Sequence, residues 1–118
     1  MHVVRKAPPG LPSRLELCWP TVKAIQSAGG TASVREINRF IEKDLGLSEA
    51  VLDLKHEKTS QSEVEYNSAW ARTYLKRRGF IDIVKTRTWT LTEHGKAATE
   101  DVIKAAFFKS SGSKKSLG

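Results

Sequence analysis

The sequence has a single cysteine, no long apolar run and no close set of metal-binding side chains. With Cys18 alone, the chain forms neither an internal disulfide nor a thiolate metal centre. His2, His56 and His94 stand far apart and lack the spacing of a metal motif. No apolar run approaches the ~20 residues that cross a bilayer. We therefore expect no disulfide, metal, cofactor or membrane span, and we expect Cys18 to be a buried small hydrophobe.

Sequence patterns of catalysis are lacking as well. The chain contains no phosphate-binding glycine loop and no nucleophile elbow. Asp44, Asp53 and Lys55 superficially match the acidic pattern of metal-dependent nucleases, which requires carboxylates on adjoining strands around a divalent ion. Here these residues fall at the end of one predicted helix and in a second short one. The sequence thus predicts no catalytic residue, and the chain itself is not expected to be an enzyme.

The two ends of the chain differ in composition from its centre. Residues 1–12 hold three prolines and several basic residues but no apolar stretch of the kind found in secretory signals. Residues 110–118 are rich in serine, glycine and lysine, as in flexible linkers. We expect a cytoplasmic protein with a flexible arm at 1–12, one domain at 13–109 and a flexible tail at 110–118.

Positive charge is what the sequence has in excess. Its 20 Lys and Arg residues outnumber its 13 Asp and Glu residues, for a net charge of +7. Most of this excess lies after residue 75, where ten basic residues face four acidic ones. A domain this basic attracts polyanions, either nucleic acid or an anionic membrane surface. Charge alone does not choose between these two partners.

Capping residues and glycines divide the chain into predicted helices. Ser33 and Ser62 each precede a glutamate by three residues, which is the capping-box spacing, and apolar residues follow at helical intervals. Glycine ends the predicted helices. The predicted helices cover 14–28 or 20–28, 34–45, 47–55 and 62–78.

After Gly79 the apolar period shortens from about 3.6 to 2. This change predicts two strands, at 80–84 and 88–91, joined as a hairpin by the turn at 85–87. Thr92 then begins a last helix. The order helix, short extended segment, two helices and hairpin is that of a winged helix-turn-helix. We therefore expect a mostly α fold with a small β-hairpin (α+β class), a winged helix-turn-helix with an additional C-terminal helix.

This element order suits double-stranded DNA, because the major groove admits one helix while a hairpin touches the adjacent backbone. The helix at 62–78 directly precedes the hairpin and is therefore the expected recognition helix. A rotation of 100° per residue places Arg72 and Arg77 at the margins of its outward face. The predicted DNA-binding residues lie before this helix, on its outward side and at the hairpin turn: Ser60, Gln61, Ser62, Tyr66, Ala69, Arg72, Thr73, Lys76, Arg77, Lys85 and Arg87.

Acidic and aromatic residues near this surface receive structural interpretations. Glu65 could accept from cytosine, but its place in the capping box favours a role as helix cap. Tyr74 is expected in the core and Trp89 is expected to cover Trp70, in preference to a stacking platform for single strands. Tyr66 is the exception, since the helical phase turns it outward.

Several segments resemble the N-terminal domain of Mrr-type restriction system proteins, over residues 15 to about 99. The segments that carry the resemblance are Trp-Pro-Thr-Val-Lys-Ala at 19–24, Val-Arg-Glu-Ile at 34–37, Trp-Ala-Arg-Thr-Tyr-Leu-Lys-Arg-Arg-Gly-Phe-Ile at 70–81 and Trp-Thr-Leu-Thr-Glu-His-Gly-Lys at 89–96. The resemblance implies a winged-helix recognition module that joins a C-terminal nuclease domain. Such proteins cut foreign DNA, in several cases when it carries methylated bases. The chain is then an excised recognition domain or a stand-alone relative, and sensing of modified bases stays open.

Two other functions fit the same residues. Winged helices also serve as protein-interaction or dimerisation modules, and Tyr66 with Phe107 and Phe108 could dock a partner or a second copy. A stand-alone transcription regulator is a further alternative. The expected partners are thus double-stranded DNA, a nuclease domain in the parent protein and, in a homodimer, another copy of the chain.

Overall fold

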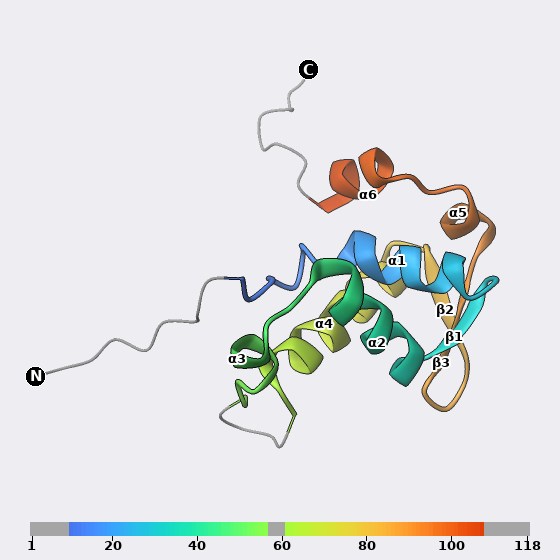
Figure 1. Cartoon of the computed structure of the whole chain (residues 1–118). Coiled ribbons are helices and arrows are strands. Elements are labelled where there is room, and N and C mark those ends of the chain that lie inside the picture. Colours follow the sequence, from blue (N-terminus) through green and yellow to red (C-terminus); the bar gives the residue numbers. More distant parts are fainter. Residues whose placement is uncertain (1–9, 57–60, 108–118) are drawn as a thin grey trace, which may run out of the picture.

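The computed structural model describes residues 10–56 and 61–107. This part of the chain forms six helices and a three-stranded antiparallel sheet at one side of them, which makes the fold mixed α+β (Figure 1). Residues 1–9 of the expected arm at 1–12, and the whole expected tail at 110–118, lie outside the described residues. The elements in chain order are α1 (Cys18–Ser27), β1 (Thr31–Ser33), α2 (Val34–Leu45), α3 (Glu49–Leu52), α4 (Glu63–Arg77), β2 (Ile81–Lys85), β3 (Thr88–Leu91), α5 (Glu93–Lys96) and α6 (Glu100–Phe107).

Helices α2, α3 and α4 begin at the serine caps that the sequence predicts. Ser33 Oγ accepts from the Glu36 backbone nitrogen at 3.1 Å, and a Glu36 carboxylate oxygen accepts from the Ser33 nitrogen at 2.8 Å. The same reciprocal pair begins α4 at Ser62, and Ser48 caps α3. Gly46 ends α2 in the left-handed conformation, with φ of 60°, where a side chain would be strained. Each cap satisfies backbone donors that a helix start leaves unpaired.

The sheet contains the predicted hairpin and one additional strand. β2 and β3 pair antiparallel from Ile81 opposite Leu91, and the strand order is β1-β3-β2. The short extended segment β1 pairs with β3, with Thr31 opposite Thr90. β1 leads directly into α2, so the sheet sets where the start of that helix lies relative to the hairpin.

Helix α1 forms the centre of the hydrophobic core. Figure 1 shows it with α6 above, α2 and α4 below and the sheet to the right, and it packs against all of these. Leu17, Val22 and Ile25 are fully buried, and Cys18 is buried as well, as the sequence predicts. Burial of side chains of this size contributes about 1.5–3 kcal/mol each. Within residues 10–56 and 61–107, no helix is long and apolar enough to cross a membrane.

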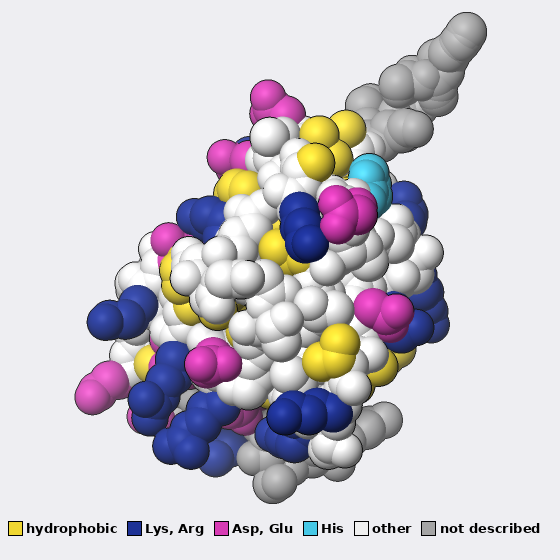
Figure 2. All heavy atoms as spheres, turned by 90° about the vertical axis from the view of Figure 1, so that its right-hand side faces the viewer, with side chains coloured by type: hydrophobic (Ala, Val, Ile, Leu, Met, Phe, Trp, Pro, Cys, Tyr) yellow, Lys and Arg dark blue, Asp and Glu magenta, His cyan; other side chains and the backbone are white. Residues whose placement is uncertain are grey.

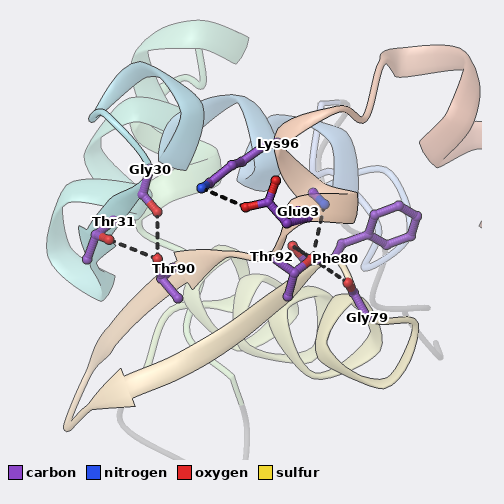
Figure 3. A network of polar contacts seen from close by, with 9 residues as sticks. Gly30, Thr31, Gly79, Phe80, Thr90, Thr92, Glu93 and Lys96 are labelled. Carbon is purple, nitrogen blue, oxygen red and sulfur yellow. Dashed lines mark hydrogen bonds and ion pairs between the residues drawn. The ribbon is translucent and has the colours of Figure 1, made fainter.

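The C-terminal region corrects one prediction, because the expected single helix after Thr92 is broken. Thr92 caps the short helix α5, and α6 begins only at Glu100, where Thr99 Oγ1 accepts from the Val102 nitrogen at 3.3 Å. Thr92 Oγ1 also donates to the carbonyl oxygens of Gly79 and Phe80, at 2.5 and 3.1 Å (Figure 3). One threonine therefore attaches α5 to the end of α4 and the start of β2.

The other side of the hairpin base is fixed by a second threonine. Thr90 Oγ1 lies 2.9 Å from Thr31 Oγ1 and donates to the Gly30 carbonyl oxygen at 2.9 Å (Figure 3). The base of the hairpin is thus bonded to β1 and to the end of the first helical segment. Its turn, at the lower right of Figure 1, extends beyond the helices.

Candidate nucleic-acid interface

Helix α4 has the orientation that its periodicity predicts. Val64, Ser68, Ala71 and Leu75 are buried on the core side. The opposite side carries half-buried Ala69 and Thr73 and exposed Lys76 and Arg77, and Gln61 just before the helix is exposed. Ser60 lies outside the described residues. The predicted outward face therefore exists, and it combines small side chains near its centre with cations near its C-terminal end.

The start of α4 is occupied by its own cap. Ser62 Oγ accepts from the Glu65 nitrogen at 3.1 Å, and the Glu65 carboxylate accepts from the Ser62 nitrogen at 3.3 Å. The structural interpretation of Glu65 is thus confirmed. The negative charge of this carboxylate lies at the start of the helix, so it also offsets the positive end of the helix dipole.

Strand β2 runs beside the outward face of α4. The Lys76 ammonium lies 3.7 Å from the Asp82 carboxylate, which connects the helix to the strand. Both side chains are at least half exposed, and an exposed pair of this kind contributes little, about 0–1 kcal/mol. Lys76 can therefore exchange this partner for a phosphate at small cost.

The turn of the hairpin presents two cations and lies next to the start of α2. Lys85 and Arg87 are exposed, and Arg87 adopts a φ of 55°. The Val34 nitrogen donates to the Arg87 carbonyl oxygen at 2.9 Å. This bond holds the turn against the first residue of α2. Exposed Ile83 and Val84, at 46% and 54%, add apolar surface to the same hairpin.

Arg35 and Arg39 are candidate interface residues that the sequence analysis missed. Both are exposed on α2, one helical turn apart, and Val34 connects this end of α2 to Arg87. Neither forms an ion pair with any residue that the structure describes. The sequence contains a signal for them, since two arginines four residues apart follow the helix cap. It does not show that this end of the helix lies beside the hairpin. Figure 2 shows the side of the molecule that lies at the right of Figure 1, and Lys and Arg side chains gather along its lower part.

Arg72 corrects the prediction most clearly, because its side chain is not on the outward face. It is 7% exposed, and its guanidinium donates to Ser68 Oγ at 3.1 Å. Ser68 in turn donates to Asn38 Oδ1 on α2 at 3.0 Å. Burial, and secondarily the charge of Arg87, lower the pKa of Arg72 to about 10. The helical phase places Arg72 at the margin of the outward face, and its side chain extends into the space between α2 and the hairpin.

That space is a groove of about 410 Å³ between α2, α4 and the hairpin. Both charged and aromatic groups line it. Its lining residues are Val34, Asn38, Gln61, Glu65, Arg72, Ile83, Arg87 and Trp89. The groove is therefore lined by two of the predicted arginines, Arg72 from α4 and Arg87 from the hairpin turn.

The aromatic residues of α4 are arranged differently from the prediction in two respects. Tyr66 is half-buried, its ring stacks on His56 at 3.7 Å, and the Arg14 guanidinium lies 5.5 Å from it. Trp70 lies under Arg14 at 4.8 Å and beside Tyr74 at 5.9 Å, whereas Trp89 packs against the core. Tyr66 is thus not a freely outward contact, and no Trp70–Trp89 stacking occurs in the described part of the chain. Core roles for Tyr74 and Trp89 are confirmed.

The surface expected for docking a partner is also largely covered. Phe107 packs against the core, with the Arg78 guanidinium 5.1 Å from its ring. Phe108 lies outside the described residues. Tyr66 and Phe107 therefore do not form an exposed apolar pair.

The described residues define a class: a small basic α+β domain whose cations gather at one helix face and one hairpin turn. Among them no group of three or more His, Cys, Asp or Glu residues could hold a metal ion, and Asp44 pairs with Lys23 at 2.9 Å. The model of the Mrr N-terminal domain family matches residues 15–101, and the chain belongs to this family. No curated protein and no solved structure is matched. The family is an N-terminal domain of Mrr-type restriction proteins and not a catalytic one.

Proposed function

We propose that the chain is a winged helix-turn-helix domain that binds double-stranded DNA. In this proposal α4 enters the major groove and the β2–β3 hairpin is the wing on the neighbouring backbone. The observation that carries it is that exposed cations lie both on α4 and on the hairpin beside it, with Arg77 at the end of α4 and Lys85 at the turn. Arg35 and Arg39 extend the same surface onto α2.

The centre of the α4 face has the size that close approach to base edges requires. Ala69 and Thr73 are small and half-buried, and the Thr73 hydroxyl donates to the Ala69 carbonyl oxygen at 3.2 Å. Longer cationic side chains lie toward the end of the helix. We assign phosphate contacts to Lys76 and Arg77 and groove contact to Ala69 and Thr73.

Family membership supports a restriction role for the parent protein. We propose that the domain recognises DNA for a C-terminal nuclease domain, and that bases altered by methylation are among the features it senses. A methyl group in the major groove is met by apolar contact. The half-buried Ala69 is the α4 residue best suited to that contact.

The test inserts one negative charge into the proposed interface and the same charge elsewhere. Ala69→Glu places a carboxylate in the groove of the polyanionic duplex, whereas Ala105→Glu makes the same change at an exposed position of α6. With a fluorescently labelled duplex, we expect Ala69→Glu to weaken binding at least about tenfold and Ala105→Glu to leave it near wild type. Thermal unfolding of both variants checks that they remain folded. Equal effects of the two substitutions would refute the α4 interface.

A further inference from the structure

The groove between α2, α4 and the hairpin contains a buried cation whose charge nothing in the described chain neutralises. Arg72 is 7% exposed, and its hydrogen-bond partner is the Ser68 hydroxyl, with no carboxylate within ion-pair distance among residues 10–56 and 61–107. Burying a charged group without a counter-charge is costly, and the cost falls when an anion binds. The remaining guanidinium donors of Arg72 are suited to such an anion, because Arg72 lines the groove.

A second guanidinium shares the groove. Arg87 lines it from the hairpin turn, and its positive charge contributes to the lowered pKa of Arg72. Glu65 also lines the groove, but its carboxylate accepts from the Ser62 nitrogen and belongs to the helix cap. Two guanidinium groups that repel each other across one groove favour an anion between them.

Ser68 orients the donors that face this space. Its hydroxyl, fully buried, accepts from Arg72 and donates to Asn38 Oδ1. The Asn38 oxygen is engaged in this way, which leaves its amide nitrogen as the donor, and Asn38 lines the groove. The buried hydroxyl thus fixes two side chains from different helices before any ligand arrives, and binding then requires little reorganisation.

We propose that this groove binds one phosphate group, held by the guanidinium groups of Arg72 and Arg87 and by the Asn38 amide. The inference rests on the proposed function, since it assigns the phosphate to the backbone of the bound duplex. The groove volume of about 410 Å³ exceeds what a single phosphate fills, which suits a phosphodiester with its sugars. Arg72 is then a buried backbone clamp and not a reader of base edges.

The variants separate the charge at the groove from the fold. Arg87→Asn removes the accessible guanidinium, and asparagine tolerates the φ of 55° at this position. Ser68→Ala removes the positioning hydroxyl, and Arg72→Lys retains the charge without the fork of donors. Lys104→Gln, on α6, removes one exposed cation outside the proposed surface and is the matched control.

The probes are a DNA duplex with single neutral methylphosphonate substitutions at successive positions, and inorganic phosphate. Among the positions whose substitution weakens wild-type binding, we expect one, at the phosphate that faces the groove, to cost about tenfold. At that position the penalty decreases in Arg87→Asn, Arg72→Lys and Ser68→Ala and persists unchanged in Lys104→Gln. Inorganic phosphate should raise the melting temperature above that in chloride at equal ionic strength, and Arg87→Asn should abolish this difference.

The outcomes separate this site from the DNA-binding function. If the duplex binds, but every methylphosphonate substitution lowers the affinity of Arg87→Asn as much as that of the wild type, the phosphate site is refuted and the DNA-binding function stands. If no duplex binds while inorganic phosphate still stabilises the chain through Arg87, the anion site stands and the function is refuted. Should Arg72→Lys fail to fold, Arg87→Asn alone decides, because that residue is exposed.

Discussion

The salt dependence of DNA binding changes by a predictable amount when the two arginines of α2 are removed. Six exposed cations lie on the proposed surface: Arg35, Arg39, Lys76, Arg77, Lys85 and Arg87. If each neutralises one phosphate, log affinity falls against log salt concentration with a slope of about −5.4. The double variant Arg35→Gln/Arg39→Gln loses two contacts, which reduces the slope to about −3.6. A fourfold rise in salt then weakens wild-type binding by about 10³-fold and variant binding by about 10²-fold.

Fluorescence anisotropy of a labelled duplex, measured between about 50 and 200 mM salt, gives both slopes directly. The control is Lys96→Gln/Lys104→Gln, which removes two exposed cations that already pair with Glu93 and Glu100 on α5 and α6. We expect the control slope to equal that of the wild type. A double variant of α2 with the wild-type slope would show that Arg35 and Arg39 do not contact the backbone.

Three further predictions concern the fold that presents this surface. Gly95→Ala should lower the free energy of unfolding by about 1–3 kcal/mol in urea titrations, because an added Cβ would overlap the Phe80 carbonyl oxygen; an unchanged midpoint would contradict this packing. Ser33→Ala should cost about 1 kcal/mol through loss of the α2 cap, whereas Ser27→Ala, at an exposed position without a side-chain bond, should cost almost nothing. Burial raises the pKa of the Cys18 thiol from 9.0 to about 12, so the thiol loses its proton at lower pH in the unfolded chain than in the folded one. The free energy of unfolding that the thiol contributes is therefore complete below pH 9 and declines between pH 9 and 12. Urea unfolding at pH 8 and 10.5 should reveal this decline in the wild type and not in Cys18→Ala.

The parts of the fold that the sequence predicts are those set by local chemistry. The caps at Ser33 and Ser62 and the change of period after Gly79 act within a few residues, so α2, α4 and the hairpin follow from neighbours in sequence. The outward phase of α4 follows from the same periodicity. The break between α5 and α6 was not predicted, because Thr99 provides a second cap where the apolar pattern continues.

The parts that could not be predicted depend on contacts between distant segments. The sequence predicts a short extended segment at 31–33, but its pairing with β3, with Thr31 opposite Thr90, depends on a contact between residues far apart in the chain. The bond from the Val34 nitrogen to the Arg87 carbonyl oxygen brings α2 to the hairpin turn, which is why Arg35 and Arg39 were missed. Helical phase placed Arg72 at a margin but could not say that a groove would enclose it.

The central claim, that one face of α4 and the hairpin turn contact a DNA duplex, is tested most directly by nuclear magnetic resonance. Backbone amide signals of the ¹⁵N-labelled chain are followed while an unlabelled duplex is added. We predict that the largest shifts fall on α4 near Ala69 and Lys76, on the turn around Arg87 and on the start of α2, and that α5 and α6 change least. Shifts confined to α1 and α6, or none at low salt, would contradict the proposed interface.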